Sequence, residues 1–338
     1  MRIRIEVNPR ELSRIIRILN DHQNEKVLIK SLLVELLRKK VSSSDYFFIL
    51  LSKLQELGLV RGKYGFLFIK EPIERETSED LIKEVVNEIL RKRKIFVTPL
   101  EVAKFYQCPR RFYLEKVVMS RQFKKEKGKI WDGEALHLAV QMFINNLTRR
   151  RVEELILEIP KLAINKFRGK ITIDEKDIRE FLIKLYRLIE EENFNFLVSE
   201  RTLVSIKRGL IGTPDIIASD GKEFVPIDVK FGRIDKKGIK KEHLLQNIGE
   251  ALLVEDFLRS KIEKCYLIYF QASSVVKVKI AKNMKKEFIF YKKELERTSK
   301  RKNIPSRSRL PNAKVRVCKG CHVKPACDNI EELFRLGR

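Results

Sequence analysis

The chain has 338 residues, and 72 Lys and Arg against 46 Asp and Glu give it a formal net charge of +26. This imbalance favours a polyanionic partner such as nucleic acid, because a thermophilic origin alone would explain abundant charge but not its sign. Residues 1–15 lack the continuous apolar segment of a signal peptide, and no apolar run approaches the length of a membrane span. We therefore expect a cytoplasmic protein with no membrane partner. The abundance of charged residues also favours a thermophilic prokaryote as the source. The composition leaves the oligomeric state open.

The first domain is expected over residues 1–95, where helical sequence precedes a short hairpin. Residues 25–40 and 42–60 have the composition of amphipathic helices, and residues 59–70 read as two short strands around a glycine turn. This order resembles a winged helix-turn-helix, and the alternative is a small helical docking domain without nucleic-acid contact. A further helix, at residues 78–93, is expected to lead out of the domain.

The second domain is expected over residues 96–338 and to begin with a helix. Residues 98–101 read Thr-Pro-Leu-Glu, which combines a capping box with proline at the first helical position. Residues 133–143 form an apolar helical stripe with His137 at its edge, where a histidine is more often a packing residue than a ligand. Residues 145–196 contain at least two amphipathic helices, which we expect to pack on the fold or to cover the site as a lid.

A β-hairpin is expected at residues 213–230. Two β-branched runs, 213–219 and 222–230, flank the dipeptide Asp-Gly, which is a strong signal for a two-residue hairpin loop. On one face of the two strands the side chains are small or apolar, as in a face packed against a core: Ile216, Ala218, Val225, Ile227 and Val229.

The other face of this hairpin carries polar residues. A two-residue loop places Asp215 opposite Pro226 and diagonal to Asp228, about 7–8 Å away between backbones. Lys230 lies two residues beyond Asp228 and hence on the same face. Two carboxylates at this separation repel each other and a phosphodiester, so the pattern indicates a divalent cation between them, Mg²⁺ or Mn²⁺. Lys230 is then placed to stabilise charge that gathers in a transition state.

Two alternatives remain open for these residues. A single Asp-x-Lys pattern is more often an ordinary salt-bridged surface hairpin, although a Pro-Asp pair separated from it by twelve residues makes this pattern far more specific. Glu200, upstream of the hairpin, either adds a carboxylate to the site or is a solvated residue at the end of a strand.

The cysteines form a second group of candidate ligands. The five are Cys108, Cys265, Cys318, Cys321 and Cys327. Cys265 falls in an apolar run and is expected to be a buried core residue. The other four suit zinc or a [4Fe–4S] cluster in a reducing compartment, and spacing does not separate the two. His322 also leaves a Cys₃His zinc site open.

Two basic segments are expected to contact DNA. Residues 291–320 read as a loop that follows a phosphate backbone, and a second basic group follows Cys108. If the cysteines meet, both segments lie on one side of the domain and form a groove in which aromatic rings stack on bases. The candidate DNA-binding residues are Arg110, Arg111, Tyr113, Lys300, Arg301 and Arg307, with Phe112 and Phe123 as further stacking residues.

The Pro-Asp pair at 214–215 and Asp-Val-Lys at 228–230 resemble the signature of the PD-(D/E)XK nuclease superfamily. The resemblance implies an α/β fold with an αβββαβ core. A helix expected at 240–258, followed by strands at 264–272 and 275–281, agrees with that order.

Gly133, His137 and Gln246 resemble the RecB-like branch of this superfamily, which carries a metal-binding histidine and a catalytic-site glutamine. That branch often has Tyr four residues after the glutamine, where this chain has Glu250. The roles that the resemblance implies are as follows: His137, Asp215, Asp228 and the Val229 carbonyl hold Mg²⁺ or Mn²⁺, Lys230 assists the attacking water, and Gln246 helps to orient it.

One cysteine before the core and three after it resemble the iron–sulfur nucleases of the RecB-like branch. These occur in the fourth CRISPR-associated (Cas) protein family, in AddB-type repair nucleases and in nucleases fused to repair helicases. The resemblance implies that Cys108, Cys318, Cys321 and Cys327 hold a structural [4Fe–4S] cluster, which clasps the tail to the start of the domain. The sequence has no Walker A pattern, so we expect no fused helicase, and its size favours the CRISPR-associated family.

The resemblance implies a metal-dependent nuclease that cleaves single-stranded DNA as an exonuclease, with endonuclease activity left open. In the CRISPR-associated family its role is to trim pre-spacer DNA alongside the CRISPR integrase complex. The alternatives are a DNA-repair nuclease of the AddB or helicase-fused type, a zinc-containing repair nuclease, and a catalytically weak DNA-binding subunit of an adaptation complex.

Overall fold

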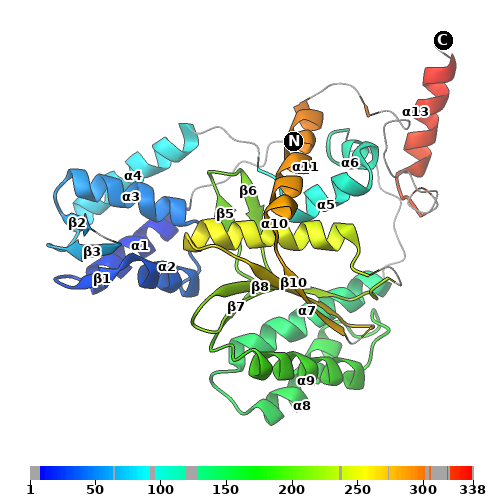
Figure 1. The fold of residues 1–338 in the computed structure, drawn as a ribbon, viewed down its shortest axis with the longest axis horizontal. Coiled ribbons are helices and arrows are strands. Elements are labelled where there is room, and N and C mark those ends of the chain that lie inside the picture. The colour runs from blue at the N-terminus through cyan, green and yellow to red at the C-terminus, as the bar shows by residue number, and fades with distance from the viewer. Residues whose placement is uncertain are drawn as a thin grey trace.

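The computed structural model describes residues 8–63, 65–91, 96–118, 128–235, 238–272, 274–300, 304–305, 318 and 320–336. Figure 1 shows a smaller N-terminal part beside a larger part built around a five-stranded sheet. In chain order the elements are α1 (Pro9–Asp21), β1 (Lys26–Leu28), α2 (Ile29–Arg38), α3 (Ser44–Glu56), β2 (Val60–Lys63), β3 (Phe66–Ile69), α4 (Arg75–Arg91), α5 (Pro99–Gln107), α6 (Pro109–Lys116), α7 (Gly128–Asn146), α8 (Val152–Lys166), α9 (Glu175–Glu191), β4 (Phe196–Ser199), β5 (Leu203–Ser205), β6 (Leu210–Gly212), β7 (Ile216–Ser219), β8 (Phe224–Lys230), α10 (Lys241–Leu258), β9 (Lys264–Tyr269), β10 (Ser274–Lys279), α11 (Lys282–Lys300) and α13 (Lys324–Leu336). None of the helices described here combines the length and the apolar character needed to cross a membrane.

The N-terminal part, α1 to α4, contains a three-stranded antiparallel sheet with strand order β1-β3-β2. The expected helices at 25–40 and 42–60 correspond to α2 and α3, and the expected hairpin corresponds to β2 and β3. Helix α1 is not among the predicted elements, and Lys26–Leu28 are predicted to be helical. These three residues form β1 instead, because pairing with β3 outweighs their local helical composition.

The larger part is an α/β fold around a sheet with strand order β10-β9-β8-β7-β4. The pair β8 and β9 is parallel, and the other neighbouring strands are antiparallel. The order α7, β4, β7, β8, α10, β9 matches the expected αβββαβ core, with the β5-β6 hairpin as an addition between β4 and β7. At the entrance to this part, Thr98 caps α5 through the expected capping box with Glu101.

The register of the β7-β8 hairpin differs from the expected one. Ser219 pairs with Phe224, so the loop has four residues rather than two. The Asp220 side chain explains the longer loop, because its carboxylate accepts hydrogen bonds from the backbone N–H groups of Lys222 and Glu223.

This register brings the two carboxylates of the hairpin closer together than expected. Ile216 pairs with Ile227, and extending that pairing by one residue sets Asp215 directly opposite Asp228 rather than diagonal to it. The shift is two residues, so each side chain stays on its expected face.

Helices cover both faces of this sheet. The apolar face of β7 and β8 packs with α7, α8 and α9, as Figure 1 shows. The opposite face, which carries Asp228, is covered by α10, so Ile217 and Phe224 are buried there. The segment 145–196 therefore supplies packing helices, α8 and α9, and not a lid.

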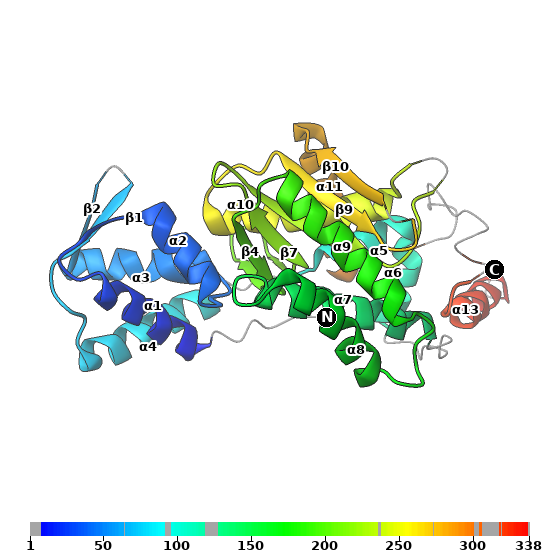
Figure 2. The ribbon, with the colours of Figure 1, turned by 90° about the horizontal axis from the view of Figure 1, so that it is seen from below.

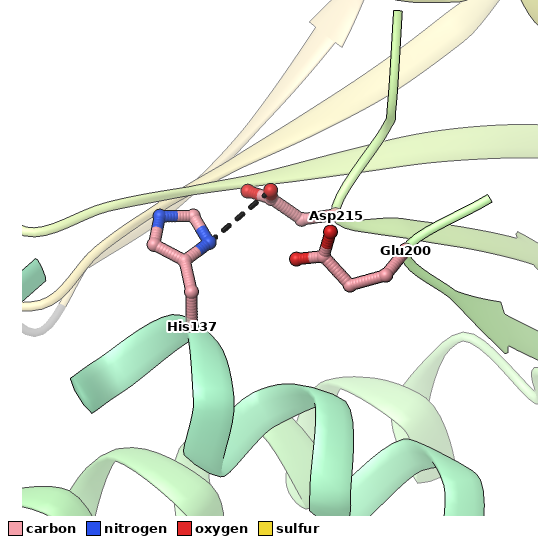
Figure 3. A group of neighbouring side chains, drawn as sticks. All are labelled: His137, Glu200 and Asp215. Atoms are coloured by element: carbon pink, nitrogen blue, oxygen red, sulfur yellow. Dashed lines mark ion pairs between the residues drawn. The ribbon is translucent and has the colours of Figure 1, made fainter. Parts of the chain in front are cut away.

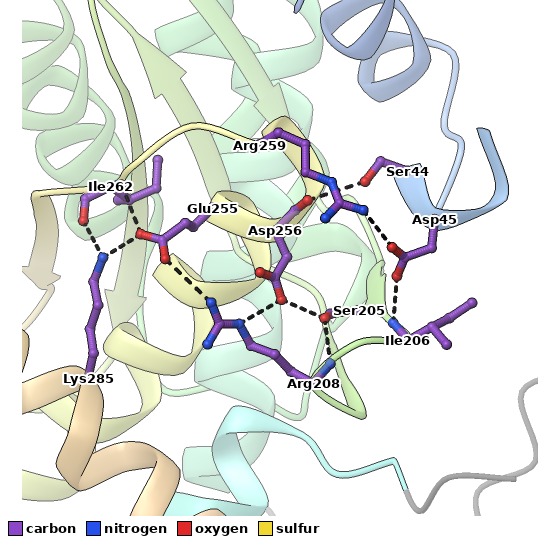
Figure 4. A network of polar contacts seen from close by, with 10 residues as sticks. All are labelled: Ser44, Asp45, Ser205, Ile206, Arg208, Glu255, Asp256, Arg259, Ile262 and Lys285. Atoms are coloured by element: carbon purple, nitrogen blue, oxygen red, sulfur yellow. Dashed lines mark hydrogen bonds and ion pairs between the residues drawn. The ribbon is translucent and has the colours of Figure 1, made fainter. Parts of the chain in front are cut away.

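A polar network joins the N-terminal part to the larger part at the end of α10 (Figure 4). Asp45, at the start of α3, accepts hydrogen bonds from the Arg259 guanidinium at 2.7 Å and from the Ile206 backbone at 2.8 Å. Ser44 donates to the Asp256 carbonyl at 3.3 Å. The Asp256 side chain also accepts hydrogen bonds from Ser205 and Arg208 of the β5-β6 hairpin. The end of α10 therefore contacts both the N-terminal part and this hairpin.

Two helical glycines form a matched test of the packing around α10. Replacing Gly249 with Ala would place a Cβ 2.6 Å from the Phe288 ring and 2.7 Å from Pro99 Cβ, so Gly249→Ala should destabilise the fold by about 1–3 kcal/mol. The control is Gly133→Ala in α7, where the nearest atom lies 4.0 Å away. The control should gain about 0.5–1 kcal/mol, because Ala is the better helix former. Urea denaturation measures both, and equal stability of the two variants would contradict this packing.

Candidate active site

Three side chains from separate elements converge at the end of β7 (Figure 3). His137 comes from α7, Glu200 follows β4, and Asp215 precedes β7. His137 Nδ1 lies 3.2 Å from Asp215 Oδ1, and one ligand atom from each of the three residues lies within 4.8 Å of the others. Burial disfavours the charged imidazole, but the Asp215 carboxylate outweighs it and raises the pKa of His137.

Glu200 is held in this group by an unusual backbone conformation. Its φ is +50°, in the left-handed region that residues other than glycine rarely adopt. The Glu200 N–H donates to the Asp215 carbonyl at 3.1 Å, which ties the two segments together. Burial and the Asp215 charge both raise the pKa of Glu200. Strain of this kind persists where the surroundings enforce it and clusters at functional sites, so Glu200 belongs with the candidate ligands.

The hairpin fixes the orientation of the Asp215 carboxylate. Its Oδ2 accepts a hydrogen bond from the Val229 backbone N–H at 2.7 Å, and its other oxygen points toward His137. Val229 thus orients a carboxylate through its N–H, and its carbonyl stays a predicted ligand.

Asp228 and Lys230 form a buried pair on β8. Asp228 is 1% exposed, and burial raises its pKa to about 6 against the opposing effect of the Lys230 charge. Lys230 Nζ donates to Asp228 Oδ1 at 2.9 Å. Asp228 Oδ2 lies 2.8 Å from the same ammonium but accepts no hydrogen bond of its own, which leaves a buried carboxylate oxygen available to a ligand.

A hydrogen-bonded chain on α10 holds Lys230 in place. Lys230 Nζ donates to Gln246 Oε1 at 2.8 Å, and Gln246 Nε2 donates to Glu250 Oε1 at 2.9 Å. Glu250 therefore decides which way the Gln246 amide points. Burial, and then the Asp228 charge, raise the pKa of Glu250 well above its usual value. Burial alone would lower the pKa of Lys230, but the Asp228 and Glu250 charges raise it, so the lysine stays an ammonium.

The donor set fits a hard divalent cation. Glu200, Asp215 and Asp228 supply carboxylate oxygens, and His137 supplies an imidazole nitrogen beside them. Carboxylates suit Mg²⁺ and Mn²⁺, and imidazole is acceptable to Mn²⁺. A cation here would offset the mutual repulsion of the carboxylates and could bind the Asp228 oxygen that accepts no hydrogen bond.

The cysteines gather elsewhere, where α5 meets α6 and α13. Cys108 lies at the junction of α5 and α6 and is buried, and burial raises the pKa of its thiol, an effect that Cys321 and Cys318 reinforce. Cys327 lies in α13, where its Sγ accepts a hydrogen bond from Arg110 Nε at 3.0 Å. Cys265 is fully buried in β9, as expected of a core residue.

His322 lies beside this group but faces a carboxylate. Its Nε2 is 2.7 Å from Glu115 Oε1, and Glu115 also pairs with Arg111. The Glu115 carboxylate thus contacts His322, the histidine of the alternative Cys₃His zinc site, and also Arg111, a candidate DNA-binding residue.

Several side chains that were predicted to contact DNA are buried in the structure. Arg110 is 2% exposed and Tyr113 is 4% exposed, so neither side chain can reach DNA, and Phe112 is equally buried. Lys300 is exposed at the end of α11, which shows that the expected loop at 291–320 begins as helix. The remaining candidates lie outside the described residues: Arg301, Arg307 and Phe123.

The comparison with protein families defines the class of this protein. Residues 97–328 match the model of the PD-(D/E)XK nuclease superfamily, and the chain belongs to that superfamily. The match includes every site residue described above. The protein is therefore a member of a superfamily of nucleases whose chemistry depends on divalent metal ions.

No match was found among curated proteins. A solved structure titled "Crystal structure of SSO0001" is similar at 17% sequence identity, covering 66% of this chain and 93% of that one. Its TM-score of 0.28 is too low to support an inference.

Asp215→Asn tests the assignment of the metal ligands. The asparagine keeps the oxygen that accepts the Val229 N–H but loses the charge, so Mn²⁺ binding should weaken by about 10–100-fold or more. Isothermal titration of Mn²⁺ into metal-free protein measures the affinity. Asp220→Asn, in the loop of the same hairpin, is the control and should bind as the wild type does. Equal affinities of the wild type and Asp215→Asn would remove Asp215 from the ligand set.

Proposed function

We propose that this protein is a Mg²⁺- or Mn²⁺-dependent nuclease that hydrolyses phosphodiester bonds in DNA. The observation that carries the proposal is the convergence of His137, Glu200 and Asp215 next to the buried Asp228–Lys230 pair. A cation bound there would polarise a phosphoryl oxygen and lower the pKa of a bound water.

The protein's own residues would then complete the site. His137, Glu200 and Asp215 would hold the cation, with Asp228, which lies opposite Asp215, and the Val229 carbonyl as further ligands. Lys230, kept protonated by its carboxylate neighbours, orients the attacking water by donating a hydrogen bond and stabilises negative charge in the transition state. Gln246 fixes the position of the ammonium.

We propose single-stranded DNA as the substrate, cut with exonuclease character, and trimming of pre-spacer DNA alongside a CRISPR integrase as the role. The net charge of +26 supports a nucleic-acid substrate. The finer assignment rests on the combined motifs of the sequence. A repair nuclease with the same site is the alternative, and the intact set of ligands and lysine argues against a subunit that only binds DNA.

We also propose a [4Fe–4S] cluster at Cys108, Cys318, Cys321 and Cys327. Cys327 lies in α13, which packs on α6, and the Cys321 and Cys318 thiols lie near enough to Cys108 to raise the pKa of its thiol. This gathering of thiols supports a shared metal group. The buried Arg110 next to Cys327 supplies positive charge for an anionic cluster, and His322 is engaged by Glu115.

For the N-terminal part we propose a winged-helix-like fold. The order α1, β1, α2, α3, β2, β3 with three paired strands supports it.

Asp228→Asn and Lys230→Met test the nuclease proposal. Each should lower metal-dependent cleavage of end-labelled single-stranded DNA by about a hundredfold or more, because the first removes the charge of a metal ligand and the second removes the ammonium that stabilises the transition state. The controls are Asp220→Asn and Lys222→Met, which make the same changes in the loop of the same hairpin and should leave cleavage unaltered. Reactions with Mn²⁺, Mg²⁺ or EDTA also show the metal dependence. Full activity in both site variants would contradict the site.

Cys327→Ser tests the cluster. Protein purified without oxygen should contain about four iron atoms per chain and absorb visible light, and the variant should lose both together with thermal stability. Cys265→Ala is the control, because this buried cysteine should not affect iron content. One zinc ion and no iron in the wild type would replace the cluster with the zinc site.

A further inference from the structure

The N-terminal sheet exposes aromatic rings on its outward face. Along β3, Leu67 and Ile69 are fully buried, whereas the alternate residues Phe66 and Phe68 are 36% and 39% exposed. Leu28, which pairs with Phe66 across β1, is 40% exposed. Three large apolar side chains thus stand together in solvent on the central and one flanking strand.

Basic side chains flank these rings. Phe68 pairs with Lys26 on one neighbouring strand and with Arg61 on the other, which makes a cross-strand row of Lys, Phe and Arg. Lys26 and Arg61 are both exposed. The Lys26 ammonium lies over one face of the Phe66 ring, 4.6 Å from its centroid. None of the described side chains on this face of the three strands is acidic.

The other element of this part that could meet DNA is already engaged. No residue of α3 between Ser44 and Leu51 is exposed, because this end of the helix docks on the larger part. Phe48 of α3 lies against the Arg259 guanidinium, with 4.7 Å between the guanidinium carbon and the ring centroid. The first two turns of α3 therefore cannot lie in a groove of duplex DNA.

We propose that the outward face of the β1-β3-β2 sheet, formed by Lys26, Leu28, Arg61, Phe66 and Phe68, binds single-stranded DNA by stacking bases on the two phenylalanine rings. The proposal takes its class of ligand from the nuclease function proposed above. Unpaired bases stack on exposed aromatic rings whatever their identity, and neighbouring cations bind the phosphates. Duplex DNA hides its bases and cannot use the rings.

The position of this face defines what it does for the enzyme. Figure 2 shows the N-terminal part at one end of the molecule and α13 at the other, with the larger part between them. The network at Asp45 fixes the N-terminal part against the larger part. The face is thus a second DNA contact, separate from the active site, that retains a long single strand while its end is cleaved.

The test measures binding in the Asp228→Asn background, in which the DNA stays intact. Fluorescence anisotropy with labelled oligothymidine should show at least about tenfold weaker binding after Phe66→Ala and Phe68→Ala together, since stacking of each base contributes this much. Phe66→Trp with Phe68→Trp should restore binding, because tryptophan also stacks. The matched control is Phe290→Ala, which removes an exposed phenylalanine from α11 and should change nothing.

Two further readouts locate the contact. Lys26→Ala and Arg61→Ala should each reduce the salt dependence of binding, by about 0.7 in the slope of log K against log salt concentration. Oligonucleotides that carry 5-iododeoxyuridine should crosslink under ultraviolet light to the peptide that contains Phe66 and Phe68, as identified by mass spectrometry.

Unchanged binding in the double alanine variant, or crosslinks confined to other peptides, would overturn the proposal. A wild-type dimer that the double alanine variant converts to monomer, with DNA binding retained, would also overturn it and make the face a contact between copies of this chain. If the wild type cleaves DNA while binding is unchanged in the variant, only this proposal fails. If the variant loses binding but the wild type does not cleave, only the nuclease proposal fails.

Discussion

The structure around the site depends on the repulsion between carboxylates that the fold forces together. Asp215 and Asp228 face each other across the β7-β8 hairpin, and Glu200 is held beside them in a strained conformation. Burial raises the pKa of Asp228 and of Glu200, because the charged carboxylates are poorly solvated there and have no metal counter-ion. His137 and Lys230 offset only part of this effect, and a divalent cation would offset the rest. The repulsion between these carboxylates favours binding of a metal ion, and it does nothing to stabilise the fold.

Helix α10 connects this site to the rest of the molecule. Its middle carries Gln246 and Glu250, which hold the Lys230 ammonium against Asp228. Gly249 on the same helix allows Phe288 and Pro99 to approach, so α5 and α11 cover the outer side of α10. Its end carries Asp256, which anchors the N-terminal part (Figure 4). The position of Lys230 and the docking of the N-terminal part thus depend on one packed helix.

Much of the core could be predicted from the sequence, because its signals are local. The alternation along β7 and β8 identified the apolar face that packs on α7, α8 and α9, and the capping box at Thr98 located the start of α5. The hairpin register could not be predicted, since it depends on Asp220 capping its own loop. Charged and aromatic residues near Cys108 resembled DNA contacts, but Arg110 and Tyr113 are buried. Their burial depends on packing between segments far apart in sequence, on which residue type and spacing carry no information. The left-handed backbone of Glu200 and the role of Glu250 likewise arise only from tertiary contacts.

The central claim is that these carboxylates and His137 bind one divalent cation. Crystals of the wild-type protein grown with Mn²⁺ and measured at the manganese absorption edge test it most directly. The account predicts an anomalous difference peak within bonding distance of His137, Glu200, Asp215 and Asp228, with Lys230 still paired to Asp228. A cleavage-competent crystal with no peak at these residues, or with its only peak elsewhere, would contradict the account.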